Sequence, residues 1–376
     1  MTPSSVLGLV SYKVFPAQMG GQKCVAQFYA HLSKTTAVSL AVPKNDLASG
    51  NVGYTVLPLL YDHWWGFLNL LKVYRLSKII SKKNISHLII EHSYFGWLGL
   101  LLKRITKIPV IIRSHNIEAH RFRDLQRGWW RLYEWYEKNV HRRVDHSFFI
   151  TPEDMSWAIA NWQLDAGKCS ILTYGTDITA PVSDTEKQRC RAQLVNDHQL
   201  DPAERLFLFS GSLDYLPNTD ALRILITEII PLLLTAGFRF RIFLCGAHLN
   251  SQWQEVIKAY PNIIYKGFVE QLDKLTAGVD CFINPVTLGS GIKTKLVETL
   301  ALSQRAISTA MGAKGLSKEM FGNQLTIVAD YDWPSFAARM MDVDVTLPAV
   351  TPAIFYSEFN WDHIVQKALL SLQPNE

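Results

Sequence analysis

VDCFINPVTLGSGIKTKLVETLALSQRAISTA (residues 279–310) alternates in the way that a parallel α/β sheet requires. The apolar run VDCFINP is followed by a glycine-rich turn, an amphipathic segment and the β-branched run RAISTA. Strand, helix and strand in this order predict two parallel strands joined by a crossover helix. The turn, from Gly289 to Lys295, carries two glycines, a serine and two lysines at the start of the helix, which is typical of an anion site. It has neither the Gly-Lys-Ser/Thr ending of a P-loop nor the third glycine of a dinucleotide fingerprint, so the identity of the anion stays open.

The same alternation runs through the whole chain of 376 residues, which is too long for one ordinary hydrophobic core. The expected strands of the first half are SVLGLVS, TAVSLAV, HLIIE, PVIIRS, HSFFIT and CSILTY. Those of the second half are RLFLFSG, RFRIFLCG, NIIYKG, VDCFINP, RAISTA and LTIVAD. A polar stretch (175–206) separates the halves. We therefore expect an α/β protein of two Rossmann-like, doubly wound domains, residues 1–180 and residues 181–353, facing across a cleft.

Composition limits the class of protein. A hydrophobic content of 48% and a charged content of 19% are globular values. Five scattered cysteines without paired spacing predict reduced, buried thiols in a cytoplasmic protein. Residues 1–180 hold 21 Lys and Arg against 12 Asp and Glu, whereas residues 181–376 hold 17 against 21. A basic half suits nucleic acid, an anionic membrane or an anionic substrate, and ordinary solvated lysines are an equally good explanation.

Two strand ends of the first half carry candidate functional residues. Gly20 and Gly21 follow the first strand and open a helix, where backbone N–H groups can approach a ligand, although a tight βα turn explains them equally well. Glu91 and His92 follow a buried strand, where a carboxylate and an imidazole can bind sugar hydroxyls or transfer a proton. Taken alone, His92 is better explained as a cap of the next helix.

A third strand end is followed by charged and polar residues and then by a helix dense in Arg, Trp and Tyr. The candidate functional side chains here are Arg113, His115, Asn116 and Glu118. The aromatic helix suits phosphate groups or a membrane interface. We expect its large apolar residues to lie in the core, with the arginines solvated: Trp129, Trp130, Leu132 and Trp135.

The second half offers two further turns after strands. Gly211 and Ser212 form a turn whose free hydroxyl could hold a phosphate oxygen, although a plain turn is common. Gly267 follows another strand, and the peptide groups of Phe268 and Val269 could meet the edge of a base.

Taken together and in this order, these segments resemble glycosyltransferase family 4, the retaining enzymes of the GT-B fold. The similarity spans nearly the whole chain. It rests on the Gly-Gly loop, TPEDMSWAI followed by YGTDI, GSLDYLPNTDAL, the block GSGIKTKLVETLALSQRAISTAMGAKGL and the closing FNWDHIVQKAL. The resemblance implies that the last segment, 354–376, is a helix that crosses back to the first domain.

The resemblance also assigns roles to individual residues of the donor-binding block. Glu298 matches the family's second motif glutamate, which is expected to hold the ribose of a nucleotide. Ser290 stands where many members carry a first glutamate, eight positions earlier, so the choice of donor sugar is least predictable there. The backbone of Gly291 and Ile292 remains available to the donor. The full expected donor set is Gly20, Gly21, Gly211, Ser212, Gly267, Phe268, Val269, Gly289, Ser290, Gly291, Ile292, Lys293, Thr294, Lys295 and Glu298.

The charged groups of this set suggest how the leaving group is stabilised. Lys293 and Lys295 are expected to neutralise the leaving diphosphate, which needs fixed positive charge, although two lysines that flank a solvated helix end are the alternative. Many members carry an arginine on the pyrophosphate where this chain has Ser212, so the resemblance shifts that electrostatic work to the lysines. His92 matches a histidine close to the donor sugar. We expect catalytic roles for His92, Lys293 and Glu298, and an acceptor near the residues from Arg113 to Glu118.

The resemblance implies retaining transfer of a sugar from a nucleoside diphosphate to a hydroxyl of a glycan or lipid-linked acceptor, as in bacterial surface polysaccharide or glycolipid synthesis. No metal or other cofactor is expected, since fixed cations and helix dipoles replace it. Peripheral contact with an anionic membrane explains the basic half without nucleic acid. Two alternatives stay open: a non-hydrolysing nucleotide-sugar epimerase of the same fold, and a nucleotide-sugar-binding protein with little turnover.

Overall fold

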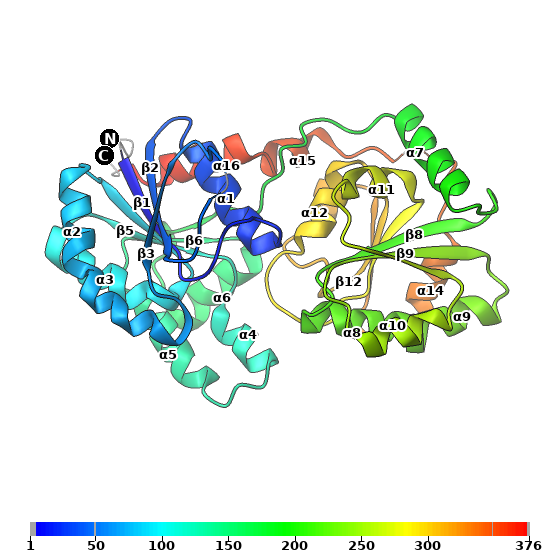
Figure 1. Cartoon of the computed structure of the whole chain (residues 1–376), viewed down its shortest axis with the longest axis horizontal. Coiled ribbons are helices and arrows are strands. Elements are labelled where there is room, and N and C mark those ends of the chain that lie inside the picture. Colours follow the sequence, from blue (N-terminus) through cyan, green and yellow to red (C-terminus); the bar gives the residue numbers. More distant parts are fainter. Residues whose placement is uncertain (1–4, 49, 348, 374–376) are drawn as a thin grey trace. The chain divides into compact units, whose positions relative to one another are not determined.

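The computed structural model describes residues 5–48, 50–347 and 349–373, and the chain divides into two compact units (Figure 1). Unit 1 comprises the chain up to Gly175 together with the residues from Glu358 onward, and unit 2 runs from Thr176 to Ser357. Each unit is built around one sheet, of seven strands in unit 1 and six in unit 2. The expected fold class, two doubly wound parallel α/β domains, is confirmed.

The sheet of unit 1 has the order β3-β2-β1-β4-β5-β6-β7, and every neighbouring pair is parallel. Its strands are β1 (Ser5–Leu9), β2 (Ala37–Pro43), β3 (Thr55–Leu60), β4 (His87–Glu91), β5 (Val110–Ser114), β6 (His146–Phe149) and β7 (Cys169–Ile171). The sequence predicted all of these except β3. That strand contains Pro58 and lies at the edge of the sheet, where a proline is tolerated because the missing N–H is not needed by a further strand.

Helices cover both faces of this sheet. They are α1 (Gly20–Leu32), η1 (His63–Lys72), α2 (Val73–Lys82), η2 (Ser93–Phe95), α3 (Gly96–Thr106), α4 (Glu118–Asp124), α5 (Trp130–His141), α6 (Pro152–Trp162), η3 (Ala166–Lys168) and α16 (Trp361–Ser371). From β1 the chain adds β2 and β3 on one side, and after β3 it crosses to the other side of β1 and adds β4 to β7. Because parallel crossovers are right-handed, α1 lies on one face of the sheet and α2, α3 and α5 lie on the other. Helix α3 packs so closely on β4 that a Cβ on Gly99 would lie 2.1 Å from Cδ1 of Ile90. Figure 1 shows α2, α3 and α5 as one layer.

The C-terminal helix belongs to unit 1, as the resemblance implied. α16 packs against α1, and Asp362 lies 2.6 Å from Nδ1 of His31 and 2.9 Å from Nζ of Lys34. Trp361 is buried, and its ring meets that of Tyr174 edge to face at a centroid distance of 5.6 Å. These contacts fix the end of the chain on the helix that begins with the Gly-Gly pair.

Unit 2 repeats the architecture with the strand order β10-β9-β8-β11-β12-β13. Its strands are β8 (Arg205–Ser210), β9 (Phe240–Cys245), β10 (Ile263–Gly267), β11 (Cys281–Asn284), β12 (Ala306–Thr309) and β13 (Leu325–Val328), all of which the sequence predicted. Its helices are α7 (Asp184–Asp197), α8 (Leu216–Ile224), the π-helical turn η4 (Leu225–Ile229), α9 (Ile230–Thr235), α10 (Ser251–Lys258), α11 (Leu272–Gly278), α12 (Thr294–Ala301), α13 (Lys318–Phe321), α14 (Trp333–Met341) and α15 (Ala353–Glu358).

The expected place of the aromatic helix residues in the core is wrong. Of the four residues expected in the core, Trp130 is half-buried and the other three are exposed: Trp129, Leu132 and Trp135. α5 instead buries Glu137 and Val140, which lie four and seven residues after the half-buried Tyr133 and therefore share its face of the helix. Leu132 and Trp135 of α5 thus point to solvent.

The cysteines are all free thiols. Four of them are buried and Cys169 is half-buried. In the part of the chain that the structure describes, no helix is both long and apolar enough to span a bilayer.

Candidate active site

The two units each collect candidate residues at the carboxyl ends of their parallel strands. In unit 1 the first of these is the start of α1, where Gly20 and Gly21 are the first two helical residues. Oε1 of Gln22 accepts hydrogen bonds from the backbone N–H groups of Gln18, at 3.1 Å, and Met19, at 3.0 Å, and so shapes the turn into the helix. A Cβ on Gly21 would come no closer than 3.9 Å to the hydroxyl of Tyr12, so the space above this turn is open.

His92 follows β4 directly and has an unusual backbone. Its φ of 60° is positive, a conformation that costs energy for a residue with a side chain and that clusters at functional sites. It occupies the N-cap position of η2, but its side chain makes no capping hydrogen bond. The imidazole turns towards the neighbouring strand end instead, and its Nδ1 lies 2.9 Å from Oε1 of Glu118. The capping explanation offered by the sequence is therefore not the one that the structure shows.

Glu118, at the start of α4, is fully buried and holds several groups together. Its Oε1 accepts from Nδ2 of Asn116 at 2.6 Å, and its Oε2 accepts from Nη1 of Arg121 at 3.1 Å and from the hydroxyl of Tyr94. Burial opposes the charged form of this carboxylate. The close approach and charge of His92, with Arg121 and Tyr94, outweigh burial and hold the pKa of Glu118 at about 2.

A second buried carboxylate lies beside it. Oε2 of Glu91 accepts from Nη1 of Arg113 at 3.1 Å and lies 2.6 Å from Nε2 of His115. Burial raises the pKa of Glu91, but Arg113 and His115 outweigh burial and bring it to about 2. Burial, together with the neighbouring His92 and Arg113, lowers the pKa of His115 to about 3, so His115 is neutral at pH 7 and donates from Nε2. The rings of His92 and His115 are 4.2 Å apart, which joins the two carboxylate clusters.

The structure thus brings Arg113, His115, Asn116 and Glu118 together, but as a support for His92 in which only Asn116 is partly exposed. The guanidinium of Arg113 is completely enclosed, with Nη2 donating to Sγ of Cys24 at 3.0 Å. Direct contact of these four side chains with an acceptor stays a prediction.

Glu137 of α5 is a site residue that the sequence analysis missed. It is fully buried and accepts hydrogen bonds from the backbone N–H groups of Glu118, at 3.1 Å, and Ala119, at 2.9 Å, and from the hydroxyl of Ser93, at 2.9 Å. Burial and the charge of Glu118 raise its pKa to about 8. Its helical spacing from Tyr133 and Val140 was the signal that could have placed it on the inner face of α5.

The glycine-rich loop of unit 2 is closed by one of its own lysines. Gly289 and Gly291 have φ values of 84° and 74°, which only glycine adopts readily. Nζ of Lys293 donates to the carbonyls of Gly289, at 3.0 Å, and Gly291, at 3.1 Å. The hydroxyl oxygen of Ser290 is buried and has no hydrogen-bond partner among the described residues. A buried polar atom in this state is costly unless a ligand completes it.

Glu298 lies on α12, just over one turn from its start. Its Oε2 accepts from Nζ of Lys295 at 2.8 Å, and both side chains keep part of their surface exposed. The expected diphosphate lysine and the expected ribose carboxylate are therefore partners of each other in this structure.

The other donor candidates of unit 2 meet at the same edge of its sheet. The carbonyl of Gly267 accepts a hydrogen bond at 2.8 Å from the N–H of Gly246. A Cβ on Gly246 would lie 1.9 Å from the carbonyl oxygen of Gly211, so the backbones of Gly246 and Gly211 are in close contact. A Cβ on Gly289 would meet Pro217 at 3.1 Å, so the glycine-rich loop lies against the loop that follows β8. The turns after β8, β9, β10 and β11 thus form one surface, with Phe268 exposed on it and Val269 half-buried.

Ser212 differs from its sequence expectation. Its hydroxyl donates to Oδ1 of Asp214 at 2.6 Å and is therefore not free. Across residues 5–48, 50–347 and 349–373, no group of three His, Cys, Asp or Glu side chains is arranged to hold a metal ion.

Comparisons with known proteins agree with this fold. The family model "Glycosyltransferase Family 4" matches residues 20–180, and the model "Glycosyl transferases group 1" matches residues 204–343. The first covers most of unit 1 and includes His92 and Glu118, and the second covers the glycine-rich loop and Glu298. No curated protein matches the chain by sequence.

Solved structures share the fold at low sequence identity. Sucrose-phosphate synthase from Thermosynechococcus elongatus is 16% identical, with 97% of each chain covered and a TM-score of 0.75. A glycosyltransferase from Rickettsia africae is 13% identical, with 99% of each chain covered and a TM-score of 0.73. HepE of Anabaena, in complex with UDP-glucose, is 14% identical, with 98% of this chain and 100% of HepE covered and a TM-score of 0.71.

Proposed function

We propose a reaction for this chain on the basis that it belongs to glycosyltransferase family 4 and has the GT-B fold. The chain transfers a sugar from a nucleoside-diphosphate sugar to an acceptor hydroxyl, with net retention at the anomeric carbon. The observation that carries the proposal is the loop from Gly289 to Lys293 at the start of α12, with Glu298 one turn further on, inside the segment that the group 1 model matches.

The donor is assigned to unit 2. Glu298 accepts hydrogen bonds from the ribose, and Lys295 releases Glu298 to meet the diphosphate. Lys293 keeps the loop closed through its two carbonyl contacts, so that the N–H groups of Gly291 and Ile292 face the phosphates. The UDP-glucose of the HepE structure supports a nucleotide sugar of this kind as the donor.

The chemical step breaks the bond between the anomeric carbon and the phosphate oxygen and forms one to the acceptor oxygen. The departing diphosphate takes up the acceptor's proton, so no strong protein base is needed. Lysine and backbone N–H groups stabilise the developing negative charge. His92 hydrogen-bonds a hydroxyl of the transferred sugar, with Glu118 fixing its ring.

The acceptor is proposed to be a glycan or a lipid-linked sugar, in the cytoplasmic synthesis of a bacterial surface polysaccharide or glycolipid. The basic N-terminal half is proposed to make peripheral contact with an anionic membrane. The reaction is proposed to be independent of metal, so turnover should persist in excess EDTA; loss of turnover that added Mg²⁺ or Mn²⁺ restores would refute this.

A thermal-shift screen against nucleotide sugars tests the donor, because a ligand that binds only the folded chain raises its melting temperature. The donor selected in this way is then incubated with lipid-linked and free glycan acceptors, and the anomeric configuration of the product is read by NMR. A product of the same configuration as the donor supports the proposal. Nucleotide-sugar interconversion without an acceptor would instead identify an epimerase, and binding without turnover a nucleotide-sugar-binding protein.

A further inference from the structure

One face of unit 1 exposes large apolar side chains in a continuous segment. η1 and the first turn of α2 present five of them to solvent, each between 60% and 74% exposed: Trp65, Phe67, Leu70, Leu71 and Tyr74. Single exposed apolar residues are ordinary on a protein surface, but a cluster of this size marks an interaction site. Five such side chains within ten residues therefore indicate a surface that a binding partner buries.

The same face is positively charged, and the segment 63–107 that forms it carries no exposed carboxylate; Asp145, which pairs with Lys103, comes from outside this segment. Between Asp62 and Glu118 the only acidic residue is Glu91, which is fully buried. The segment 63–107 holds eight Lys and Arg: Lys72, Arg75, Lys78, Lys82, Lys83, Lys103, Arg104 and Lys107. On α2, Arg75, Lys78 and Lys82 are exposed on the solvent side, with Nζ of Lys78 lying 4.6 Å from the ring centre of Tyr74. Cations and apolar groups are thus interleaved along one surface.

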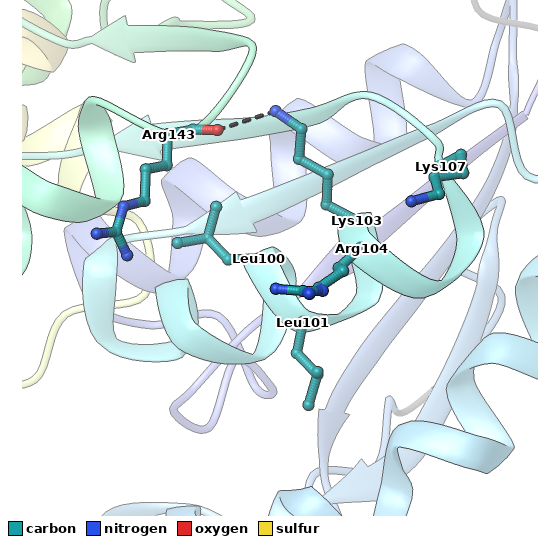
Figure 2. A pocket seen from close by; sticks show the side chains of 6 residues that line it. All are labelled: Leu100, Leu101, Lys103, Arg104, Lys107 and Arg143. Atoms are coloured by element: carbon teal, nitrogen blue, oxygen red, sulfur yellow. Dashed lines mark hydrogen bonds between the residues drawn. The ribbon is translucent and has the colours of Figure 1, made fainter.

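Helix α3, the neighbour of α2 in the same layer, extends this surface. A depression of about 580 Å³ on α3 has leucines in its wall and four cations around it (Figure 2). Its lining residues are Leu100, Leu101, Lys103, Arg104, Lys107 and Arg143. Lys103 is paired with Asp145 at 2.8 Å and also donates to the carbonyl of Arg143, so the charge left to a ligand comes from Arg104, Lys107 and Arg143.

We propose that this face, formed by η1, α2 and α3 and called here the basic apolar face, docks on a bilayer that contains anionic phospholipid. The phosphates of the headgroups pair with Arg75, Lys78 and Lys82 and enter the depression on α3, while Leu70 and Leu71 reach the acyl boundary. Lysine and arginine stems cover apolar surface with the charge directed outward, which suits this geometry.

The chemistry of the face favours a bilayer over a soluble partner. A nucleic acid would use the cations and the aromatic rings, but it offers nothing to the aliphatic side chains of Leu70 and Leu71. The buried centre of a protein interface is depleted in charge, whereas here the cations are interspersed with the apolar groups. The inference deepens the membrane contact of the proposed function and rests on that part of it; its failure would leave the transfer reaction intact.

The test measures co-sedimentation of the full chain with vesicles at low salt. One set of vesicles is phosphatidylcholine alone and the other contains about one third phosphatidylglycerol. Each cation near an anionic surface contributes about fivefold to partitioning, so R75Q/K78Q/K82Q should lose on the order of a hundredfold. A matched control, R189Q/K258Q/R339Q, removes the same charge from exposed side chains of unit 2 and should bind as the wild type does.

A second pair of variants tests the apolar half of the face. Leu70→Ser with Leu71→Ser should weaken binding about tenfold or more, with the larger effect in high salt, where the cations are screened. The control replaces the exposed Leu234 and Leu347 of unit 2 by Ser and should change nothing. Thermal melting and nucleotide-sugar affinity are measured for every variant and should remain those of the wild type.

Three outcomes would overturn the inference. The first is a wild type that does not sediment with the anionic vesicles. The second is an equal loss of binding by both charge variants, which would indicate net charge and no defined face. The third is a leucine variant that binds vesicles normally while R75Q/K78Q/K82Q loses binding to duplex DNA, which would assign the face to nucleic acid. Vesicle binding by a chain that binds no nucleotide sugar would uphold this face and refute the proposed transfer reaction.

Discussion

Nδ1 of His92 lies 2.9 Å from Oε1 of Glu118, although the two residues follow different strands of the sheet. Parallel strands bring their carboxyl ends to one edge, and β4 and β5 are neighbours there. Because a carboxylate only accepts, its approach favours a hydrogen on Nδ1 and leaves Nε2 as the ring atom that can accept from a sugar hydroxyl. Glu118 is thus placed to position a histidine whose backbone is already held at positive φ.

Replacing Glu118 by Gln should separate positioning from binding. We expect kcat to fall about 10- to 100-fold, because the ring of His92 loses its orientation and its carboxylate partner, and we expect the pH profile of kcat to change shape. The Kd of UDP, measured by calorimetry, should not change, because the nucleotide is assigned to unit 2. Asp124→Asn, on the same helix, is the control. A kcat equal to that of the wild type would show that Glu118 serves folding alone.

The second prediction concerns the ribose. Glu298→Gln removes the charged acceptor of the proposed ribose hydrogen bonds, so the Kd of UDP should rise about 10- to 100-fold in calorimetry. The change also breaks an i,i+3 ion pair with Lys295, and the same kind of pair joins Glu255 and Lys258 at 2.6 Å on α10. Glu255→Gln is therefore the matched control. Equal affinity in both variants would remove Glu298 from the donor site.

The sequence predicted the fold well because the signals of a parallel sheet are local. Twelve of the strands were expected from short apolar runs, and only β3, with Pro58 inside it, was missed. The positions of the candidate residues at strand ends followed from the same pattern, since Gly289 and His92 come directly after apolar runs.

Their partners were harder to predict because they come from distant segments. No local pattern shows that Glu118 turns towards His92, or that Lys293 binds the carbonyls of its own loop. The exposure of Trp135 and the burial of Glu137 were misjudged for a related reason: side-chain type suggested one face of α5 as the core, and the packing of the helix on its neighbours selected another.

The third prediction uses the unpaired hydroxyl of Ser290. Ser290→Ala should leave the melting temperature of the free chain unchanged or slightly higher, because the hydroxyl has no hydrogen-bond partner among the described residues. The same variant should bind the donor sugar about 5- to 10-fold more weakly while its affinity for UDP is kept, if the hydroxyl is completed by the sugar. A drop in melting temperature with unchanged donor affinity would mean that the hydroxyl serves the loop instead.

The last prediction concerns the pH dependence of stability and needs no assumption about function. His141 is fully enclosed, stacked on Phe149 at a ring distance of 5.2 Å with Nδ1 2.9 Å from the hydroxyl of Ser147, and burial lowers its pKa to about 3. A histidine whose folded pKa lies below its unfolded value of about 6.5 is protonated at a lower pH in the folded state than in the unfolded state. Its contribution to stability is complete above pH 6.5 and is lost as the pH falls towards 3.

Replacing His141 by Gln removes the proton that this histidine takes up on unfolding. Between pH 6.5 and 4.5 the free energy of unfolding of the variant should fall less steeply than that of the wild type, by about 1.4 kcal/mol per pH unit. Urea unfolding at pH 7.5, 6.0 and 5.0 measures the difference. His363→Gln, at an exposed position of α16, should keep the wild-type slope. Parallel curves for the wild type and His141→Gln would mean that His141 is protonated in the folded state as readily as in the unfolded one, and that its enclosure between α5 and β6 does not exclude water.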